Sequence, residues 1–349
     1  MSKASELANL IGNINAGGGG ANKNVVINGA MNVNQRGTVT GVGNNAYTLD
    51  RFAFTYSQDG AFTVTQDSSS PDGFANSLKL DVTTADSSLS ASQYLIMEHK
   101  IEGQNLQTLA FGTSDAKNIA LSFYVKSNKT GTYGVSIIQS DNSSKIANLT
   151  YTINSADTWE QKSLTFTGDT SGVINDDNGI GLKLGFTLAV GSTWTSGDTS
   201  ASFRTFVNGN YGAGQTVNIL DSTSNEWLIT GVQLEVGQNP TEFEHEPIER
   251  TLSKCHRYYY KTSTVTHFNV GRLDSGAGVG YSWRAHPVTM RTAPTMSSSG
   301  TWNSGTGYGG DPTYQASTTT GVTIKTTNGM SANEIFYLTG GEFIGEAEL

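Results

Sequence analysis

The sequence predicts an all-β protein: a β-sandwich, then a short helix, then a smaller antiparallel β unit. Its 349 residues include 41 glycines but only 6 prolines, and charged residues make up 15% of the total. Such a composition, rich also in Ser, Thr and Asn, is typical of short strands joined by polar turns. Runs of alternating apolar and polar residues recur without an intervening helix over the first two thirds of the chain. This pattern indicates a sandwich.

Two segments far apart in the sequence are expected to open and close that sandwich. The first, Asn24–Gly37, starts with the β-branched run Val25–Ile27 and breaks at an Asn-Gly turn. The second, Trp227–Gly237, alternates cleanly between two faces. We therefore expect two strands that meet although about 200 residues separate them in the chain.

The strands between these two segments follow from the same alternation. We expect them at Arg51–Tyr56, Ala61–Thr65, Ser77–Val82, Tyr94–Ile101, Ile119–Ser127, Gly134–Gln139, Ile146–Ile153, Thr158–Phe166 and Leu182–Val190. Residues 191–226 are rich in Gly, Ser, Thr and Asn, which favours a large loop or an added hairpin.

Four regions result. Residues 1–23 predict a helical tab and a Gly-rich linker, useful for docking onto another chain; the alternative is a frayed terminus. The sandwich occupies 24–245. A connecting helix is expected over 246–257, where a proline lies in the first turn and apolar residues share one face. A C-terminal β domain is expected over 258–349, with its Gly- and Ser-rich section 297–312 as exposed loops.

Charge and cysteine content exclude several classes of protein. A net charge of −9 without any basic cluster argues against nucleic-acid binding, which depends on clustered Lys and Arg. No apolar run reaches the roughly 18 residues of a membrane span, and no signal peptide is visible at the N-terminus. Cys255 is the single cysteine, which excludes a disulfide framework and favours synthesis in a reducing cytoplasm.

An ordered series of short motifs carries a resemblance to a known group. The series is Asn28-Gly-Ala-Met-Asn-Val-Asn-Gln-Arg-Gly37, Tyr47-Thr-Leu-Asp-Arg-Phe52, Ile101-Glu-Gly103, Leu121–Lys126, Thr158–Phe166, Gly231-Val-Gln-Leu-Glu-Val-Gly237, Pro240–Glu244, Glu249–Tyr259, Pro287–Pro294 and Ile344–Leu349. In this order they resemble tail-fibre and virion-surface proteins of tailed bacteriophages, built on a jelly roll similar to carbohydrate-binding modules. The group commonly has tryptophan where this sequence has Asn34 and Phe52.

The resemblance implies a jelly-roll sandwich on the surface of a virion, in a tail or head appendage made in the bacterial cytoplasm. It implies a homotrimer attached to other virion proteins through its N-terminal segment and contacting host surface polysaccharide. We expect a non-enzymatic tail fibre or receptor-binding protein. The alternatives are a head fibre or capsid decoration protein with a purely structural role, and a capsule depolymerase.

A structural calcium ion is also implied, because modules of this fold often hold one between the first and last strands. Calcium is bound by six to eight oxygen atoms. Asn28, Asn32 and Glu235 lie at the corresponding strand ends, with Asp50 as a further ligand. The alternative is that Glu235 faces solvent. The acidic run Asn175–Gly179 is better explained as a turn.

Exposed aromatic side chains are the candidates for glycan binding, because sugars stack on aromatic faces. The candidates lie in loop-like sequence, where a core does not claim them: Trp302, Tyr308, Tyr314, Trp194 and Tyr211. Packing against a neighbouring subunit is the alternative. Trp159, Trp227 and Trp283 fall within alternating strands and are expected in the core.

Catalysis finds little support in the sequence. The five histidines show no metal-ligand spacing, and Cys255 lies on the apolar face of the expected helix. Glu242, Glu244, Glu246 and Glu249 cluster before that helix, where its dipole explains them as well as glycoside hydrolysis would. No catalytic residue is therefore assigned.

Overall fold

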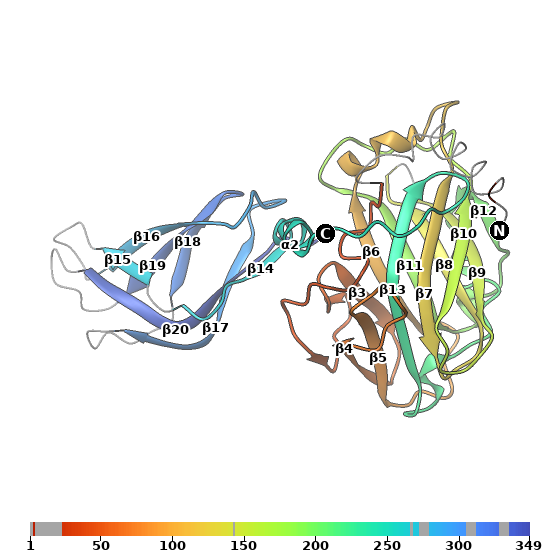
Figure 1. Ribbon diagram of the computed structural model, residues 1–349, viewed down its shortest axis with the longest axis horizontal. Helices are drawn as coiled ribbons and strands as arrows, with labels where there is room; N and C mark the ends of the chain where they lie inside the picture. The colour runs from red at the N-terminus through yellow and green to blue at the C-terminus, as the bar shows by residue number, and fades with distance from the viewer. Residues whose placement is uncertain are drawn as a thin grey trace. The chain divides into compact units, whose positions relative to one another are not determined.

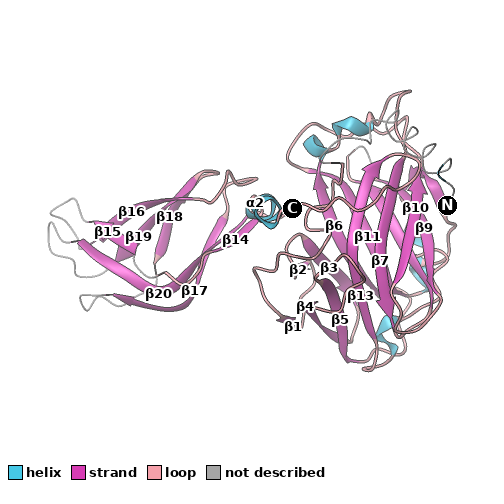
Figure 2. Ribbon diagram, viewed as in Figure 1, coloured by secondary structure: helices cyan, strands magenta, loops and turns pink. Residues whose placement is uncertain are grey.

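The computed structural model describes residue 3 and residues 23–141, 144–265, 268–271, 279–304, 312–327 and 335–349. The chain divides into two compact units, Met1–Ile248 and Glu249–Leu349. Strands make up nearly all of the regular structure in each (Figure 2), which confirms the all-β prediction. No helix in the described part of the chain is long and apolar enough to span a membrane.

The first unit is a sandwich of two antiparallel sheets (Figure 1). The six-stranded sheet has the order β1-β4-β5-β13-β7-β10 and the seven-stranded sheet the order β12-β9-β8-β11-β6-β3-β2. Consecutive strands repeatedly change sheets, as from β5 to β6, from β7 to β8 and from β9 to β10, which is the connectivity of a jelly roll.

The strand bounds follow the predicted alternation closely, and β7 matches it residue for residue. The six-stranded sheet consists of β1 (Val39–Thr40), β4 (Ala61–Asp67), β5 (Ser77–Thr84), β7 (Ile119–Ser127), β10 (Glu160–Phe166) and β13 (Glu226–Val236). The seven-stranded sheet consists of β2 (Ala46–Tyr47), β3 (Phe52–Ser57), β6 (Tyr94–Glu102), β8 (Gly131–Gln139), β9 (Lys145–Ile153), β11 (Ile180–Val190) and β12 (Ser200–Thr205).

The core of this unit lies between the two sheets. Phe123 of β7 and Phe186 of β11 meet there edge to face, with ring centroids 5.0 Å apart. Trp227 is fully buried, as predicted, and its indole N–H donates to the hydroxyl of Tyr151 at 3.3 Å. Trp159, also expected in the core, is partly exposed, which makes that prediction wrong. Alternation placed it on a strand, but it lies just before β10 begins.

The opening segment forms no strand over Val25–Ile27, contrary to prediction, yet it does lie along β13. The Val25 N–H donates to the Leu234 carbonyl at 3.0 Å, and the Val232 N–H donates to the Gly29 carbonyl at 2.9 Å. The Asn24 side chain completes the pairing, since its amide accepts from the Leu234 N–H and donates to the Val232 carbonyl. An asparagine side chain here replaces the backbone groups of a regular ladder.

Two glycines permit this close approach. A Cβ atom on Gly29 would lie 2.0 Å from the Val232 carbonyl oxygen. On β13, Gly231 has φ of +62° and lies in a register shift between Thr230 and Gln233, where the strand bulges. Before the bulge β13 pairs with β5; beyond it, the opening segment occupies that edge.

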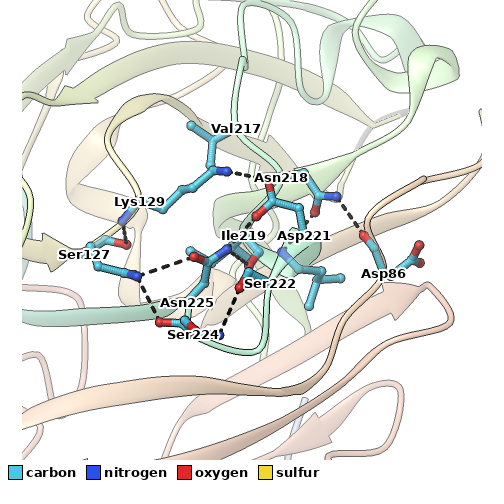
Figure 3. Close-up of polar contacts among 12 residues, drawn as sticks. Asp86, Ser127, Lys129, Val217, Asn218, Ile219, Asp221, Ser222, Ser224 and Asn225 are labelled. Carbon is cyan, nitrogen blue, oxygen red and sulfur yellow. Dashed lines mark hydrogen bonds and ion pairs between the residues drawn. The ribbon is translucent and has the colours of Figure 1, made fainter.

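The connection over 191–226 is more ordered than a plain loop. It contains η3 (Ser192–Trp194), β12, η4 (Asn208–Asn210) and η5 (Ile219–Asp221). A polar network fixes its last turn before β13 (Figure 3). The Asn218 side chain accepts from the Leu220 N–H at 3.0 Å and so caps η5. Asn225 donates to the Ile219 carbonyl at 2.8 Å and to the Asp221 carboxylate at 2.7 Å.

The edges of the sandwich differ from its centre. β1 and β2, at one end of each sheet, are two residues long. At the other ends, β10 and β12 are tied together, because Thr167 forms a parallel bridge with Ser202 and its N–H donates to the Ala201 carbonyl at 2.9 Å. One open side of the sandwich is thereby closed.

The second unit is a smaller antiparallel β structure that follows the predicted helix. Its sheet has the order β14-β20-β15-β16-β19-β18, and β17 also pairs with β20. Cys255 is buried on the helix, as expected. The elements are α2 (Ile248–His256), β14 (Tyr259–Lys261), β15 (Phe268–Gly271), β16 (Val279–Ala285), β17 (Thr295–Ser304), β18 (Thr313–Ser317), β19 (Gly321–Thr327) and β20 (Ile335–Glu346).

His99 links the opening segment to the seven-stranded sheet. Its ring is buried, packs edge-on against Phe52 with centroids 5.1 Å apart, and its Nε2 atom lies 3.2 Å from the backbone nitrogen of Ile27. Burial, reinforced by the positive charge of Arg51, holds the pKa of His99 well below its usual value.

Substitution of Gly29 by alanine should break the contact with β13. We expect the free energy of unfolding to fall by about 3 kcal/mol, because a Cβ atom cannot lie 2.0 Å from a carbonyl oxygen without displacing the backbone. Urea unfolding measures this. Gly43→Ala is the matched control, since its Cβ atom would make an ordinary contact at 3.8 Å. Equal stability of the two variants would contradict the proposed role of Gly29.

The lowered pKa of His99 predicts a pH-dependent stability. Between the folded pKa and the unfolded value of about 6.5, the unfolded chain binds a proton that the folded chain does not. Stability should therefore be complete above about pH 6.5 and decline below it, by up to about 1.4 kcal/mol per pH unit. Urea unfolding of wild type and His99→Gln at several pH values checks this. The variant should show a flatter profile, and parallel profiles would refute the assignment.

Candidate functional site

A hollow of about 290 Å³ lies on the outer face of the seven-stranded sheet, away from the core. Its lining combines aromatic, charged and amide side chains. The lining residues are Thr55, Tyr94, Glu98, Ile138, Ser144, Lys183, Trp194, Phe206, Asn208 and Tyr211.

Strand alternation supplies the floor of the hollow. On β6, Met97 and His99 point into the core, so Glu98 between them points to the outer face. On β11, Leu182 and Leu184 are core residues, which places Lys183 on the same outer face. Lys183 pairs in register with Ile138 of β8. With Thr55 of β3, the floor thus comes from four neighbouring strands, β8, β11, β6 and β3.

The connection after β11 supplies the walls. η3 brings Trp194 over the sheet, where its indole N–H donates to the Ser92 carbonyl at 2.8 Å. The Gly212 N–H donates to the Trp194 carbonyl at 2.8 Å, which holds the two ends of the wall together. Phe206 is anchored by its own N–H, which donates to the Ser144 carbonyl at 3.0 Å.

The aromatic rings of the walls contact one another. The centroid of Trp194 lies 4.9 Å from that of Tyr94 and 6.0 Å from that of Tyr211. The ring centroids of Phe206 and Tyr211 lie 5.8 Å apart. These edge-to-face contacts fix the ring orientations. The walls are therefore formed before any ligand binds.

Glu98 and Tyr211 form the polar bond at the base of the hollow. Both are largely buried, and the Tyr211 hydroxyl donates to Glu98 Oε1 at 2.9 Å. Burial, together with the Glu98 charge, raises the pKa of Tyr211 well above its usual value, so the hydroxyl keeps its proton. Gly185 pairs with Glu98 in register, and a Cβ atom there would lie 3.8 Å from the Tyr211 hydroxyl.

The structure brings together two of the residues predicted to bind glycan, and two others, Trp302 and Tyr314, belong to the second unit. Trp194 and Tyr211 both line the hollow. Trp302 is 8% exposed and packs on Phe343 with centroids 4.8 Å apart, so its predicted exposure is wrong. Tyr314 is partly buried, and its hydroxyl donates to the Ser297 carbonyl at 2.8 Å. Tyr308 lies outside the described residues.

Trp302 was predicted to be exposed and is buried, whereas Trp283 was predicted in the core and is exposed. Section 297–312, predicted as loops, begins within β17, and a register shift between Gly300 and Asn303 turns Trp302 inward. Trp283, predicted in the core, is 62% exposed, because on β16 the neighbouring Arg284 lies over the core ring of Phe343 at 5.1 Å. The long aliphatic stem of arginine covers apolar surface here.

The three predicted calcium ligands make separate hydrogen bonds, none of which joins one of them to another. Asn28 is buried and bonds the backbone of Val33 in both directions, at 2.9 Å each. The Asn32 side chain accepts from Asn76 at 3.0 Å. Glu235 is buried, not solvent-facing, and accepts from the Thr241 N–H at 2.6 Å.

Asp50, the further ligand, accepts from both the backbone and the side chain of Gln35, at 2.7 and 2.6 Å. Over the described residues, no group of three or more His, Cys, Asp or Glu side chains is placed to hold a metal ion. These amide and carboxylate oxygens position the opening segment and the end of β13, and the Asn28 side chain also donates to the Asp50 carbonyl at 3.1 Å. Calcium binding at this place stays a prediction.

Sequence reasoning missed Tyr94, Glu98, Lys183 and Phe206. Tyr94, Glu98 and Lys183 lie on the outward-facing side of strands whose residues alternate between apolar and polar. That side ordinarily faces solvent. Phe206 lies in the same connection as Trp194 and Tyr211, so its presence there was the available signal. What the pattern did not contain was the return of that connection across the sheet.

No protein-family description matches the sequence, and no curated protein matches it. The enzymatically active domain of tailspike protein 4 from bacteriophage CBA120 is 14% identical, with a TM-score of 0.32, over 61% of this chain and 21% of that one. This chain thus spans about a fifth of the tailspike chain.

Two carbohydrate-binding modules are similar over more of their own length. The family 11 module of the cellulase Lic26A-Cel5E of Clostridium thermocellum is 10% identical, with a TM-score of 0.31, over 58% of this chain and 97% of that one. The xylan-binding domain from CBM 22 is 10% identical, with a TM-score of 0.32, over 60% and 99%. These likenesses are limited to architecture and do not bear on what this chain binds.

Removal of the Tyr211 hydroxyl should destabilise the first unit. Tyr211→Phe leaves the buried Glu98 carboxylate without its donor, and we expect the free energy of unfolding to fall by about 1–3 kcal/mol. Tyr94→Phe is the matched control, because the Tyr94 hydroxyl makes no hydrogen bond within the described residues. Urea unfolding should separate the two variants. A similar loss in both would remove the Tyr211–Glu98 bond as the cause.

Proposed function

We propose that this protein is a non-enzymatic glycan-binding component of a bacteriophage virion, and that the hollow on the seven-stranded sheet holds the sugar. The carrying observation is that four aromatic rings and several polar side chains converge on one preformed hollow. Sugars present apolar C–H faces that stack on aromatic rings and hydroxyl groups that pair with carboxylates and amides. The lining offers both kinds of group.

The size of the hollow favours a short stretch of glycan. Its volume of about 290 Å³ lies at the low end of ligand sites in proteins, which run from about 300 to 1,000 Å³. One or two sugar rings fill such a space. A terminal or branching sugar of a bacterial surface polysaccharide therefore suits it better than the interior of a long chain lying in a groove.

The virion role is supported by the ordered series of sequence motifs, which resembles tail-fibre and virion-surface proteins. On this proposal the protein is a homotrimeric tail fibre or receptor-binding protein, attached to the particle through its N-terminal segment. A head fibre or capsid decoration protein is the competing role for the same fold. Gold labelling of intact particles distinguishes them: label at the tail tip is expected, and label on capsid faces would overturn the tail-fibre role.

Removal of one aromatic wall should weaken glycan binding. We expect Trp194→Ala to lower the affinity for host surface polysaccharide fragments by about tenfold or more, equivalent to about 1.4 kcal/mol. Isothermal titration of the full chain with fragments selected on a glycan array measures this. Unchanged affinity would exclude the hollow as the sugar site.

Trp159→Ala is the matched control for that experiment. Trp159 is also partly exposed, and it adjoins the opposite sheet, with the Lys126 ammonium 5.6 Å from its ring. Its removal should leave affinity unchanged. An equal loss in both variants would indicate general aromatic adhesion. Release of oligosaccharides from the polysaccharide during the titration would overturn the non-enzymatic part of the proposal.

A further inference from the structure

We infer that the hollow selects an acidic sugar, one that carries a carboxylate such as a hexuronate, and that Lys183 binds that carboxylate. This inference rests on the proposed function, since it specifies the ligand class of the same site. It is carried by the placement of Lys183 among the other charged groups of the hollow.

Lys183 makes no hydrogen bond or ion pair within the described residues. Among the described residues, five other lysines each pair with a carboxylate, whereas Lys117 and Lys325 do not. The five are Lys79, Lys129, Lys145, Lys162 and Lys261. The chain has 30 acidic residues against 21 basic ones, so carboxylates are plentiful. An ammonium group without such a partner, in a hollow walled by aromatic rings, therefore marks a place for an external anion.

The neighbour of Lys183 on the next strand strengthens this. In the register of β11 and β6, Lys183 lies directly opposite Lys100. Like charges directly opposite on adjacent strands repel and destabilise a sheet. Lys100 has its ammonium 5.5 Å from the ring of Tyr47, which draws it toward that aromatic face. A bound carboxylate would offset the remaining repulsion at Lys183.

The carboxylate in the hollow does not serve as the missing partner. Glu98 Oε1 accepts from the Tyr211 hydroxyl, and no atom of Glu98 comes within ion-pair distance of Lys183. Tyr211 is held by rings on both sides, at Trp194 and Phe206, so this bond is fixed. The hollow thus keeps an acceptor near Tyr211 and a cation at Lys183, which suits a sugar with a hydroxyl on one side and a carboxylate on the other.

Matched pairs of ligands test this inference. A panel of short oligosaccharides built on different hexuronates is titrated into the full chain, each as the free acid and as its uncharged methyl ester. We expect at least one free acid to bind about tenfold or more tightly than its ester, since a charge-assisted bond is about twice as strong as a neutral one. Added salt should reduce that preference.

Lys183→Gln identifies the residue responsible. It should bind the acid and the ester equally, at about the wild-type affinity for the ester. Its melting temperature should equal or exceed that of the wild type, because the repulsion from Lys100 is relieved. Lys325→Gln, on β19 of the other unit, is the matched control and should keep the preference. A preference that survives Lys183→Gln would overturn the role of Lys183.

The two proposals fail in different ways. If acid and ester bind with equal affinity and Trp194→Ala weakens both, the acidic-sugar inference is wrong and the glycan-binding function stands. If no member of the acidic panel binds but a neutral glycan does, the outcome is the same. If no glycan binds, or if Trp194→Ala changes nothing, the proposed function falls and the inference falls with it.

Discussion

The sandwich depends on the hydrogen bonds that join the start of the described chain to β13. Beyond its bulge at Gly231, β13 no longer pairs with β5, and the segment from Asn24 to Gly29 occupies the vacated edge. The bond from the Asn24 side chain to the Val232 carbonyl spans 208 positions of sequence. Closing so long a loop carries an entropic cost, which the whole sandwich must offset together. The closure is therefore a property of the complete unit.

Most strands of the sandwich could be predicted because each keeps the same face against the core along its whole length. A strand such as β7, covered on its inner face along its whole length, shows its burial directly in its alternation. The opening segment could not be predicted as it is, because an asparagine side chain there replaces backbone groups of the ladder. Alternation also does not say which face of a strand is covered. On β16 the aromatic phase faces out while Arg284 lies over the core, and so Trp283 was misplaced.

The candidate site also depends on which face of a strand is covered, which alternation does not tell. Trp194 and Tyr211 were recognisable because large aromatic residues in polar, Gly-rich sequence have no evident core to join. Glu98 and Lys183 looked like ordinary solvent-facing residues of two strands. Their meaning depends on where the connection after β11 returns across the sheet, which is settled by tertiary contacts such as the bond between Gly212 and Trp194. No local pattern contains that information.

The short or bridged end strands of the sandwich affect how copies of this protein behave when they are close together. Unpaired strand edges are the usual starting points for aggregation, because any extended chain can add to them. Here β1 and β2 offer two residues each, and β10 and β12 are tied to one another through Thr167. The outermost strands β1 and β2 are thus too short to template a long added strand, and the β10 end is held to β12 at one point. If the protein is displayed in many copies on a surface, as the proposed function requires, these edges limit strand pairing between neighbouring copies, and each copy keeps its own fold during multivalent attachment.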